Sequence, residues 1–178
     1  MSAPLPPSTR LAAQRGDRAA RAELVAVYGG LVFSLCRRYA TDPEDAYQDA
    51  WVHVLSRLHR YDETRGASLR TWLALIVRNR LTDRRRVRRI RGEVVAPDEA
   101  QPSPDPTPEQ HAHRRRQVQR VERALSHLDP VQRDAIVLHY TADMPLSDIA
   151  RAQGVAVGTV KSRLHRARAH LAALMERS

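Results

Sequence analysis

The chain has 178 residues, a formal net charge of +10 and a pI near 11.0, with 29 arginines and a single lysine. Such a basic chain favours a polyanionic partner, because binding to phosphates releases condensed counterions, although charge alone does not separate nucleic acid from an acidic membrane surface. No run of about 18 apolar residues is evident and the N-terminus lacks the order of a secretory signal, so we expect no membrane insertion and a cytoplasmic location. The single cysteine, Cys36, excludes an internal disulfide and a multi-cysteine metal site.

The composition changes at Gly92 and divides the chain. Residues 92–110 contain no Lys or Arg, but five acidic residues and five prolines. Proline at this density breaks helices and extends the backbone. Because Ala, Leu, Arg and Glu dominate elsewhere, we predict an all-α protein. It would have two small helical domains, residues 8–91 and 114–177, joined by a flexible, Pro-rich acidic linker, residues 92–113.

The first block begins with two amphipathic patterns. They cover residues 9–14 and 18–40 and are separated at Gly16. The pair Gly29-Gly30 inside the second pattern is a further possible break, because glycine weakens a helix interior. We therefore expect three or four helices in the whole first block.

Two local signals place the remaining helices of the first block. Asp42-Pro43 suits a helix start, with acidic residues in the first turn where the helix dipole favours them. That helix ends before Asp62, at the loop DETRGAS. Ser68, the last loop residue, can cap a final helix that begins at Leu69.

The first block carries two faces of opposite charge. An acidic helix face is formed by Asp45, Gln48 and Asp49. Eight arginines lie between residues 78 and 91 against one acid. For residues 86–91 a solvated basic tail and a specific contact are equally good interpretations, whereas Arg78, Asn79 and Arg80 lie in the packed part of the helix and favour contact. The two faces suggest a bridge between nucleic acid and a basic protein surface.

The second block has the organisation of a helix-turn-helix. Helices are predicted from Asp129-Pro130 and from Pro145, and a longer one follows Gly154. Ala150 is small where two helices would cross, Gly154 allows a positive φ, and Val160 can fill the core from the last helix. These three residue types occur at the fixed spacing that a helix-turn-helix requires, which makes the pattern fairly specific for that motif.

The last helix, VGTVKSRLHRARAHLAAL, is amphipathic. Its apolar stripe is Val157, Val160, Leu164, Ala167, Leu171 and Leu174. Opposite the stripe lie Gly158, Ser162, His165 and Arg166. Small residues would let the backbone approach a groove, and the cations would reach phosphates and guanine edges. A solvated basic face is the alternative, but the turn geometry favours DNA.

Three stretches together resemble bacterial sigma factors of the extracytoplasmic-function group. They are EDAYQDAWVHVLSRLHRYD, RGASLRTWLALIVRNRLTD and VQRDAIVLHY…LSDIARAQGVAVGTVKSRLHRAR. The resemblance covers nearly the whole chain in order, with a linker in the same place. It implies a dissociable promoter-specificity subunit of RNA polymerase, with sigma region 2 first and region 4 second, and with no catalytic residue, metal or cofactor.

The resemblance also implies partners and contact residues. Asp45, Gln48 and Asp49 would dock on the clamp helices of the polymerase β′ subunit, region 4 would contact the β flap, and an anti-sigma factor is expected. The −10 element would be bound by Tyr61, Asp62, Arg65, Gly66, Ser68, Arg70, Arg78, Asn79 and Arg80. The −35 element would be bound by Val157, Gly158, Thr159, Lys161, Ser162, Arg163 and Arg166.

The sequence is compatible with two other functions and differs from the family pattern in places. A stand-alone helix-turn-helix regulator would bind duplex DNA without polymerase and would not need the acidic helix. A nucleic-acid enzyme has little support, because the sequence lacks a phosphate-binding glycine loop and a two-metal carboxylate cluster. Tyr47 stands where the family commonly has a smaller aliphatic residue. Trp72, from its spacing to Leu69 and Ile76, is expected in the core rather than as a base-stacking wedge.

Overall fold

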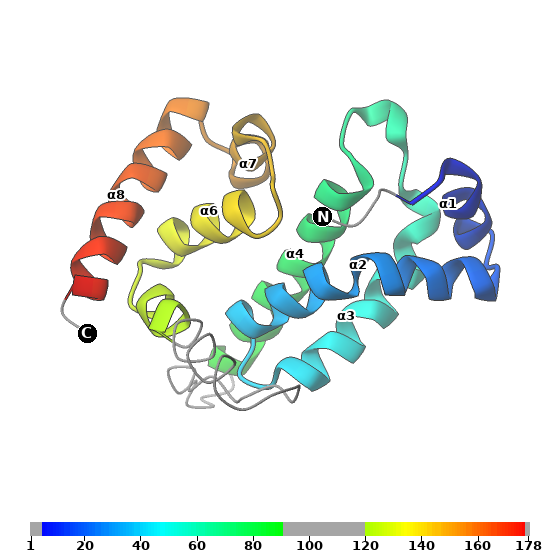
Figure 1. Cartoon of the computed structure of the whole chain (residues 1–178), viewed down its shortest axis with the longest axis horizontal. Coiled ribbons are helices and arrows are strands. Elements are labelled where there is room, and N and C mark those ends of the chain that lie inside the picture. Colours follow the sequence, from blue (N-terminus) through cyan, green and yellow to red (C-terminus); the bar gives the residue numbers. More distant parts are fainter. Residues whose placement is uncertain (1–4, 91–119, 177–178) are drawn as a thin grey trace, which may run out of the picture. The chain divides into compact units, whose positions relative to one another are not determined.

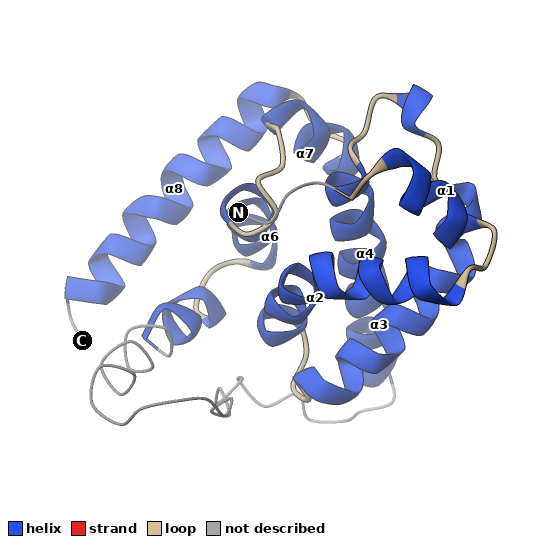
Figure 2. Cartoon of the chain, turned by 45° about the vertical axis from the view of Figure 1, so that its right-hand side comes forward, coloured by secondary structure: helices blue, strands red, loops and turns tan. Residues whose placement is uncertain are grey.

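The computed structural model describes residues 5–90 and 120–176, and the chain divides into two compact units. Helices form all the regular structure in these two ranges, and neither contains a strand (Figure 2). The all-α prediction is therefore confirmed. The predicted linker, residues 92–113, lies outside the described residues.

The first unit is a helical bundle, coloured blue to green in Figure 1. Three of its helices begin at predictable caps: the carboxylates of Asp17 and Asp42 and the hydroxyl of Ser68 each accept a hydrogen bond from a backbone N–H of the following turn. The elements are α1 (Pro7–Gln14), α2 (Arg18–Tyr39), α3 (Pro43–Arg57), the short 3-10 turns η1 (Leu58–Arg60) and η2 (Glu63–Arg65), and α4 (Leu69–Ile90).

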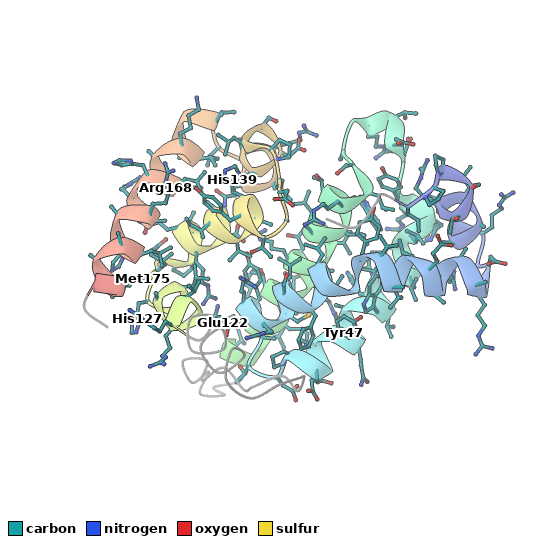
Figure 3. The ribbon with its side chains drawn as sticks, in the orientation of Figure 1. Tyr47, Glu122, His127, His139, Arg168 and Met175 are labelled. Atoms are coloured by element: carbon teal, nitrogen blue, oxygen red, sulfur yellow. The ribbon has the colours of Figure 1, made fainter. Side chains whose placement is uncertain are left out.

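The two predicted glycine breaks differ. Gly16 adopts a φ of +102° and separates α1 from α2, as expected. At Gly29-Gly30 there is no break, since packing of α2 against α3 and α4 outweighs the cost of about 1 kcal/mol per glycine. A Cβ atom added to Gly29 would lie only 2.9 Å from the hydroxyl of Tyr47, labelled in Figure 3. Gly29 thus makes room for the Tyr47 side chain.

Helix α2 is the central core helix of the first unit. Leu24, Val32 and Leu35 are fully buried, and the helix packs against α3 and α4. By length and composition alone α2 also satisfies the criteria for a membrane-spanning helix, which the sequence analysis overlooked. Its role in the bundle core accounts for that apolar composition. Cys36 is buried here as well, and desolvation raises the pKa of its thiol to about 12, so it is an unreactive core residue at neutral pH.

The second unit is the helix-turn-helix. Residues 120–126 are helical, and the carboxylate of Asp129 then accepts a hydrogen bond from the Val131 N–H (2.9 Å) to start the next helix. Helix α8 packs against both preceding helices. The elements are α6 (Pro130–Tyr140), α7 (Leu146–Gln153) and α8 (Val157–Glu176).

The three predicted features of the turn are confirmed. Gly154 adopts the left-handed conformation with a φ of +64°, Ala150 is buried, and Val160 is fully buried. The buried face of α8 continues through Leu164 and Ala167. Val157, which the sequence placed at the start of the apolar stripe, is 39% exposed, so the stripe begins one turn later than predicted. The turn thus fixes which side of α8 faces solvent.

Candidate nucleic-acid interface

Helix α8 presents a solvent-exposed polar surface, which we call the recognition face. The hydrogen bonds of Ser162 and Arg166 stay inside α8: Ser162 donates to the Thr159 carbonyl (3.0 Å), and Arg166 donates to the Ser162 carbonyl (3.4 Å). These side chains therefore need not break a contact with another element in order to bind a ligand. The recognition face consists of Val157, Gly158, Lys161, Ser162, His165 and Arg166, all of them exposed.

Gly158 is not required by the fold of the second unit. No atom lies within 4 Å of a Cβ built there, and its φ is not in the left-handed region. A helix first turn normally gains from any other residue. Gly158 therefore leaves the first turn of α8 open to close approach from outside.

Arg163 and Thr159 lie at the half-buried edge of α8 rather than on the recognition face. Arg163 donates to the side-chain oxygen of Gln153 (2.6 Å), and Gln153 in turn donates to the carboxylate of Asp134 (3.0 Å). This chain of hydrogen bonds joins α8 to α7 and α6. It fixes the orientation of the recognition face, a role that the sequence analysis did not assign to Arg163.

In the first unit the acidic face of α3 is paired with arginines of α4. Arg80 holds the Asp49 carboxylate with two hydrogen bonds of 2.7 Å, and Arg84 forms an ion pair of 2.7 Å with Asp45. The Arg80 bonds hold the pKa of Asp49 below its ordinary value and raise that of Arg80. Another Arg84 nitrogen, Nη1, lies 3.4 Å from Asp49, close enough for an ion pair but without a hydrogen bond. Gln48 remains exposed between the two pairs.

The Asp49–Arg80 pair joins two residues that were predicted to bind different partners. Asp49 was predicted to bind polymerase and Arg80 to bind DNA, and the structure places them in contact. Asp49 is about one-quarter exposed, whereas Asp45 is 62% exposed. Asp45 and Gln48 are consequently the more accessible members of the acidic face.

The loop Asp62–Ser68 joins η1 to α4, and most of its side chains are exposed. Asp62 accepts hydrogen bonds from the backbone N–H and the hydroxyl of Thr64, which lower the pKa of its carboxyl. Gly66 adopts a φ of +77°, a conformation that favours glycine. Arg65 is 81% exposed, with a long ion pair of 3.6 Å to Asp62. Arg65 is thus the cation that the loop offers to solvent.

Tyr61, predicted to contact DNA, is only 5% exposed. Its hydroxyl donates to the Ala67 carbonyl (3.1 Å), so the side chain links the two ends of the loop. Its ring lies against the half-buried Trp72, with 5.6 Å between the ring centres. The two aromatic rings pack against each other at the base of the loop. The exposed surface of Tyr61 is too small for a base to stack on.

Helix α4 carries the remaining predicted contact residues. Asn79 is exposed, and its side-chain oxygen accepts a hydrogen bond of 2.9 Å from the half-buried Arg78. Arg70 is half-buried in the first turn. Within residues 5–90 and 120–176, no three His, Cys, Asp or Glu side chains cluster as metal ligands.

The chain is similar to known proteins along both units. Residues 24–90 match the family described as Sigma-70 region 2, and residues 118–171 match the family described as Sigma-70, region 4. The ECF RNA polymerase sigma factor SigE of Mycolicibacterium smegmatis is 33% identical over 174 residues, which span 93% of this chain and 66% of SigE. The RNA polymerase sigma factor CnrH of Cupriavidus metallidurans is 34% identical over 185 residues, 93% of each chain.

A solved structure supports the same relationship. The structure of CnrH in complex with the cytosolic domain of CnrY superposes with a TM-score of 0.68 at 28% identity. The match covers 96% of this chain and 97% of CnrH. The similarity therefore extends over both units.

Proposed function

The chain belongs to the extracytoplasmic-function group of RNA polymerase sigma factors, and we propose that it binds core polymerase and directs initiation by recognising the −10 and −35 elements of promoters. The proposal is carried by the presence of two units in one chain. The region 2 unit has an acidic face on α3 and an exposed loop, and the region 4 unit has an exposed recognition face. The regions correspond to residues 8–91 and 114–177, with residues 92–113 as linker. The protein acts in the cytoplasm as a non-enzymatic subunit.

The region 4 unit binds the −35 element. The recognition face of α8 enters the major groove, as the second helix of a helix-turn-helix does. Gly158 allows close approach of the backbone, Ser162 and Lys161 lie one turn further, and Arg166 reaches a guanine edge or a phosphate. Thr159 and Arg163 flank this surface, and Arg163 keeps the helix oriented through Gln153.

The region 2 unit binds the −10 element. The loop from Asp62 to Ser68, with Arg65 and Gly66 at its exposed part, receives a base that has left the DNA stack. Asn79, Arg78 and Arg70 of α4 contact the same strand. Arg80 contributes through its pair with Asp49, and Tyr61 supports the loop.

Core polymerase binds the acidic face of α3 through the clamp helices of β′. Asp45 and Gln48 make the direct contacts because they are exposed, while Asp49 is held by Arg80. Region 4 contacts the β flap. With both domains held on one polymerase, the second promoter contact becomes effectively intramolecular, which raises avidity without new contacts.

An anti-sigma factor regulates the protein. The support is the similar CnrH structure, which contains the cytosolic domain of CnrY. Such a partner would compete with polymerase or DNA for the faces described above.

The test of core binding uses Asp45→Asn combined with Gln48→Ala. We expect this variant to bind purified core polymerase about tenfold more weakly, because two exposed interface contacts are removed. Glu23→Gln, which removes one exposed negative charge from α2, serves as the control and should bind like the wild type. Equal binding by all three proteins would contradict the docking assignment. Specific binding of duplex DNA by the chain alone, with no effect of core polymerase, would favour a stand-alone regulator.

A further inference from the structure

Helix α1 lies before the residues that match sigma region 2, yet its last residue contacts the base of the −10 loop. The side-chain amide of Gln14 donates to the Tyr61 carbonyl (2.7 Å) and to the Leu58 carbonyl (3.1 Å). A glutamine amide has two N–H donors, and both are used here. Leu58 is the first residue of η1 and its carbonyl also accepts the Tyr61 N–H (3.1 Å), so Gln14 ties together the two ends of η1 directly before the loop begins.

A second residue of α1 reaches into the loop itself. Arg10 forms a hydrogen-bonded ion pair of 2.6 Å with Glu63, the first residue of η2. The guanidinium carbon also lies 5.3 Å from the centre of the Tyr61 ring, within the range of a cation–π contact. The Arg10 side chain is only 13% exposed although Glu63 is 66% exposed. The Arg10 side chain is therefore largely buried, and through its ion pair it fixes a part of the loop that otherwise faces solvent.

These polar contacts are additional to what holds α1 in the bundle. Leu5 and Ala13 are buried and anchor α1 by apolar packing. The loop has no such anchor of its own, because residues 62–66 are all exposed. Its two ends are held differently: α1 holds the Tyr61 end, and the Tyr61–Ala67 hydrogen bond with the Ser68 cap holds the α4 end.

We propose that Gln14 and Arg10 are positioning residues that hold the loop in the shape that receives the −10 base. The inference rests on the proposed function, and it extends the −10 site to a helix outside the matched region 2. Neither residue needs to touch DNA. Without these two side chains the loop would sample more conformations. Binding of the −10 base would then have to order the loop, and this entropy cost would reduce the affinity for the base.

The variants are chosen to remove the contacts while keeping the helix. Gln14→Glu has the same shape but cannot donate to the two carbonyls, and Arg10→Ala removes both the ion pair and the ring contact. Arg10→Lys keeps the charge next to Glu63. Arg15→Ala is the matched control, because Arg15 is exposed and its Nε donates only to Leu11 within the same helix.

The experiment uses the full chain with core polymerase on a promoter mapped by sequencing of transcripts made in vitro. Permanganate reactivity of thymines measures melting of the −10 region, while core affinity and binding of the −35 duplex are measured separately. Trp51 and Trp72 both lie in the region 2 unit, so tryptophan fluorescence shows whether each variant is folded. We expect melting to fall about five- to tenfold for Gln14→Glu and for Arg10→Ala, with core affinity and −35 binding unchanged. Arg10→Lys should recover part of the loss, and Arg15→Ala should match the wild type.

The outcomes separate this inference from the proposed function. If wild-type chain and core polymerase melt no promoter, the proposed function and the inference both fall. If the wild type melts DNA and folded Gln14→Glu and Arg10→Ala do the same, the inference alone is overturned. A parallel loss of core affinity in folded variants would also overturn it, because α1 would then act on the whole unit rather than on the loop.

Discussion

The two proposed promoter-binding surfaces of this sigma factor differ in how they are held before a ligand arrives. On α8, the hydrogen bonds of the exposed Ser162 and Arg166 stay within the helix. In the region 2 unit, Asp49, assigned to polymerase, is already paired with Arg80, assigned to DNA, and Asp45 is paired with Arg84. The first surface is available as it stands. In the second, Asp45 would exchange its ion pair with Arg84 for a contact with polymerase, while the Asp49–Arg80 pair stays as an internal support.

Because of this difference, substitutions in the two units should affect folding stability to different extents. A residue whose contacts stay within an exposed helix face can be removed with little effect on folding. A residue in a half-buried, hydrogen-bonded ion pair leaves a charged partner behind when it is removed. Substitutions in α8 should thus act mainly on DNA binding, and those at the α3–α4 pairs should act on stability as well.

The largest expected effect is on promoter discrimination by Arg166→Ala. Loss of a bidentate base contact would reduce the preference for a matched −35 element by about 1–3 kcal/mol, measured as holoenzyme affinity for the promoter against the same DNA with a scrambled −35 element. Arg168→Ala is the control, since Arg168 lies at the edge of the face, 3.5 Å from the Tyr140 hydroxyl. It should weaken both DNAs equally. Unchanged discrimination in Arg166→Ala would remove Arg166 from the base-contacting set.

Two glycine substitutions separate folding from recognition within the second unit. Gly154→Ala should destabilise the helix-turn-helix by about 1–2 kcal/mol, because alanine would have to adopt a left-handed conformation. Gly158→Ala should leave the unit as stable or more stable, yet weaken binding of the −35 duplex, because the methyl group would lie between α8 and the groove. Urea denaturation followed by circular dichroism gives the stabilities. Full −35 binding by Gly158→Ala would show that the backbone does not approach the DNA at this point.

Arg80→Ala tests the paired side of the comparison. We expect the region 2 unit to lose about 1–2 kcal/mol, since Asp49 would keep only the long contact to Arg84. Tryptophan fluorescence during urea denaturation reports this unit selectively, because both tryptophans belong to it. Arg166→Ala in the same assay should match the wild type. If Arg80→Ala were as stable as the wild type, the Asp49–Arg80 pair would not contribute to the stability of the unit.

The smallest effect is the pH dependence of the Asp49–Arg80 pair. The pKa of Asp49 is lowered in the folded state, so its ionised form stabilises the unit above the unfolded pKa of about 3.9, and this contribution is lost as pH falls through the lower folded value. The stability difference between wild type and Asp49→Asn should therefore be constant near neutral pH and shrink below about pH 4. Burial lowers the pKa of the nearby His53, which destabilises the folded unit as pH falls below about 6.5, and the Asp49 carboxylate opposes part of this shift. Between about pH 6.5 and pH 4 the stability difference between the two proteins should therefore widen slightly before it shrinks. A difference that persists undiminished at pH 2 would contradict the ionic origin.

Local features of this fold were predictable from sequence, and long-range pairings were not. Asp42, Ser68 and Gly154 act within a few residues of their own position, so their residue types indicate helix starts and the turn. Helical periodicity likewise placed Gly158, Ser162 and Arg166 on one face. It cannot show what lies opposite a face in another helix, which is why the Asp49–Arg80 pair, 31 positions apart, was missed.

The same limit applies to the loop. Tyr61 was predicted as a contact because of its place in the family pattern, whereas its burial follows from packing against Trp72 and Arg10. The hydrogen bond between Gln14 and the Tyr61 carbonyl spans 47 positions and has no sequence signal. The close approach of the Tyr47 hydroxyl to Gly29, 18 positions away, likewise has no sequence signal.

The most direct test of the central claim is transcription in vitro on fragmented genomic DNA with purified core polymerase, with and without this chain. The account predicts new transcript 5′ ends that share −10 and −35 elements, with the −35 preference lost in Arg166→Ala and DNA melting lost in Asn79→Ala. If the chain produced no new start sites, or bound specific duplex DNA without engaging core polymerase, the account of a two-surface sigma factor would be contradicted.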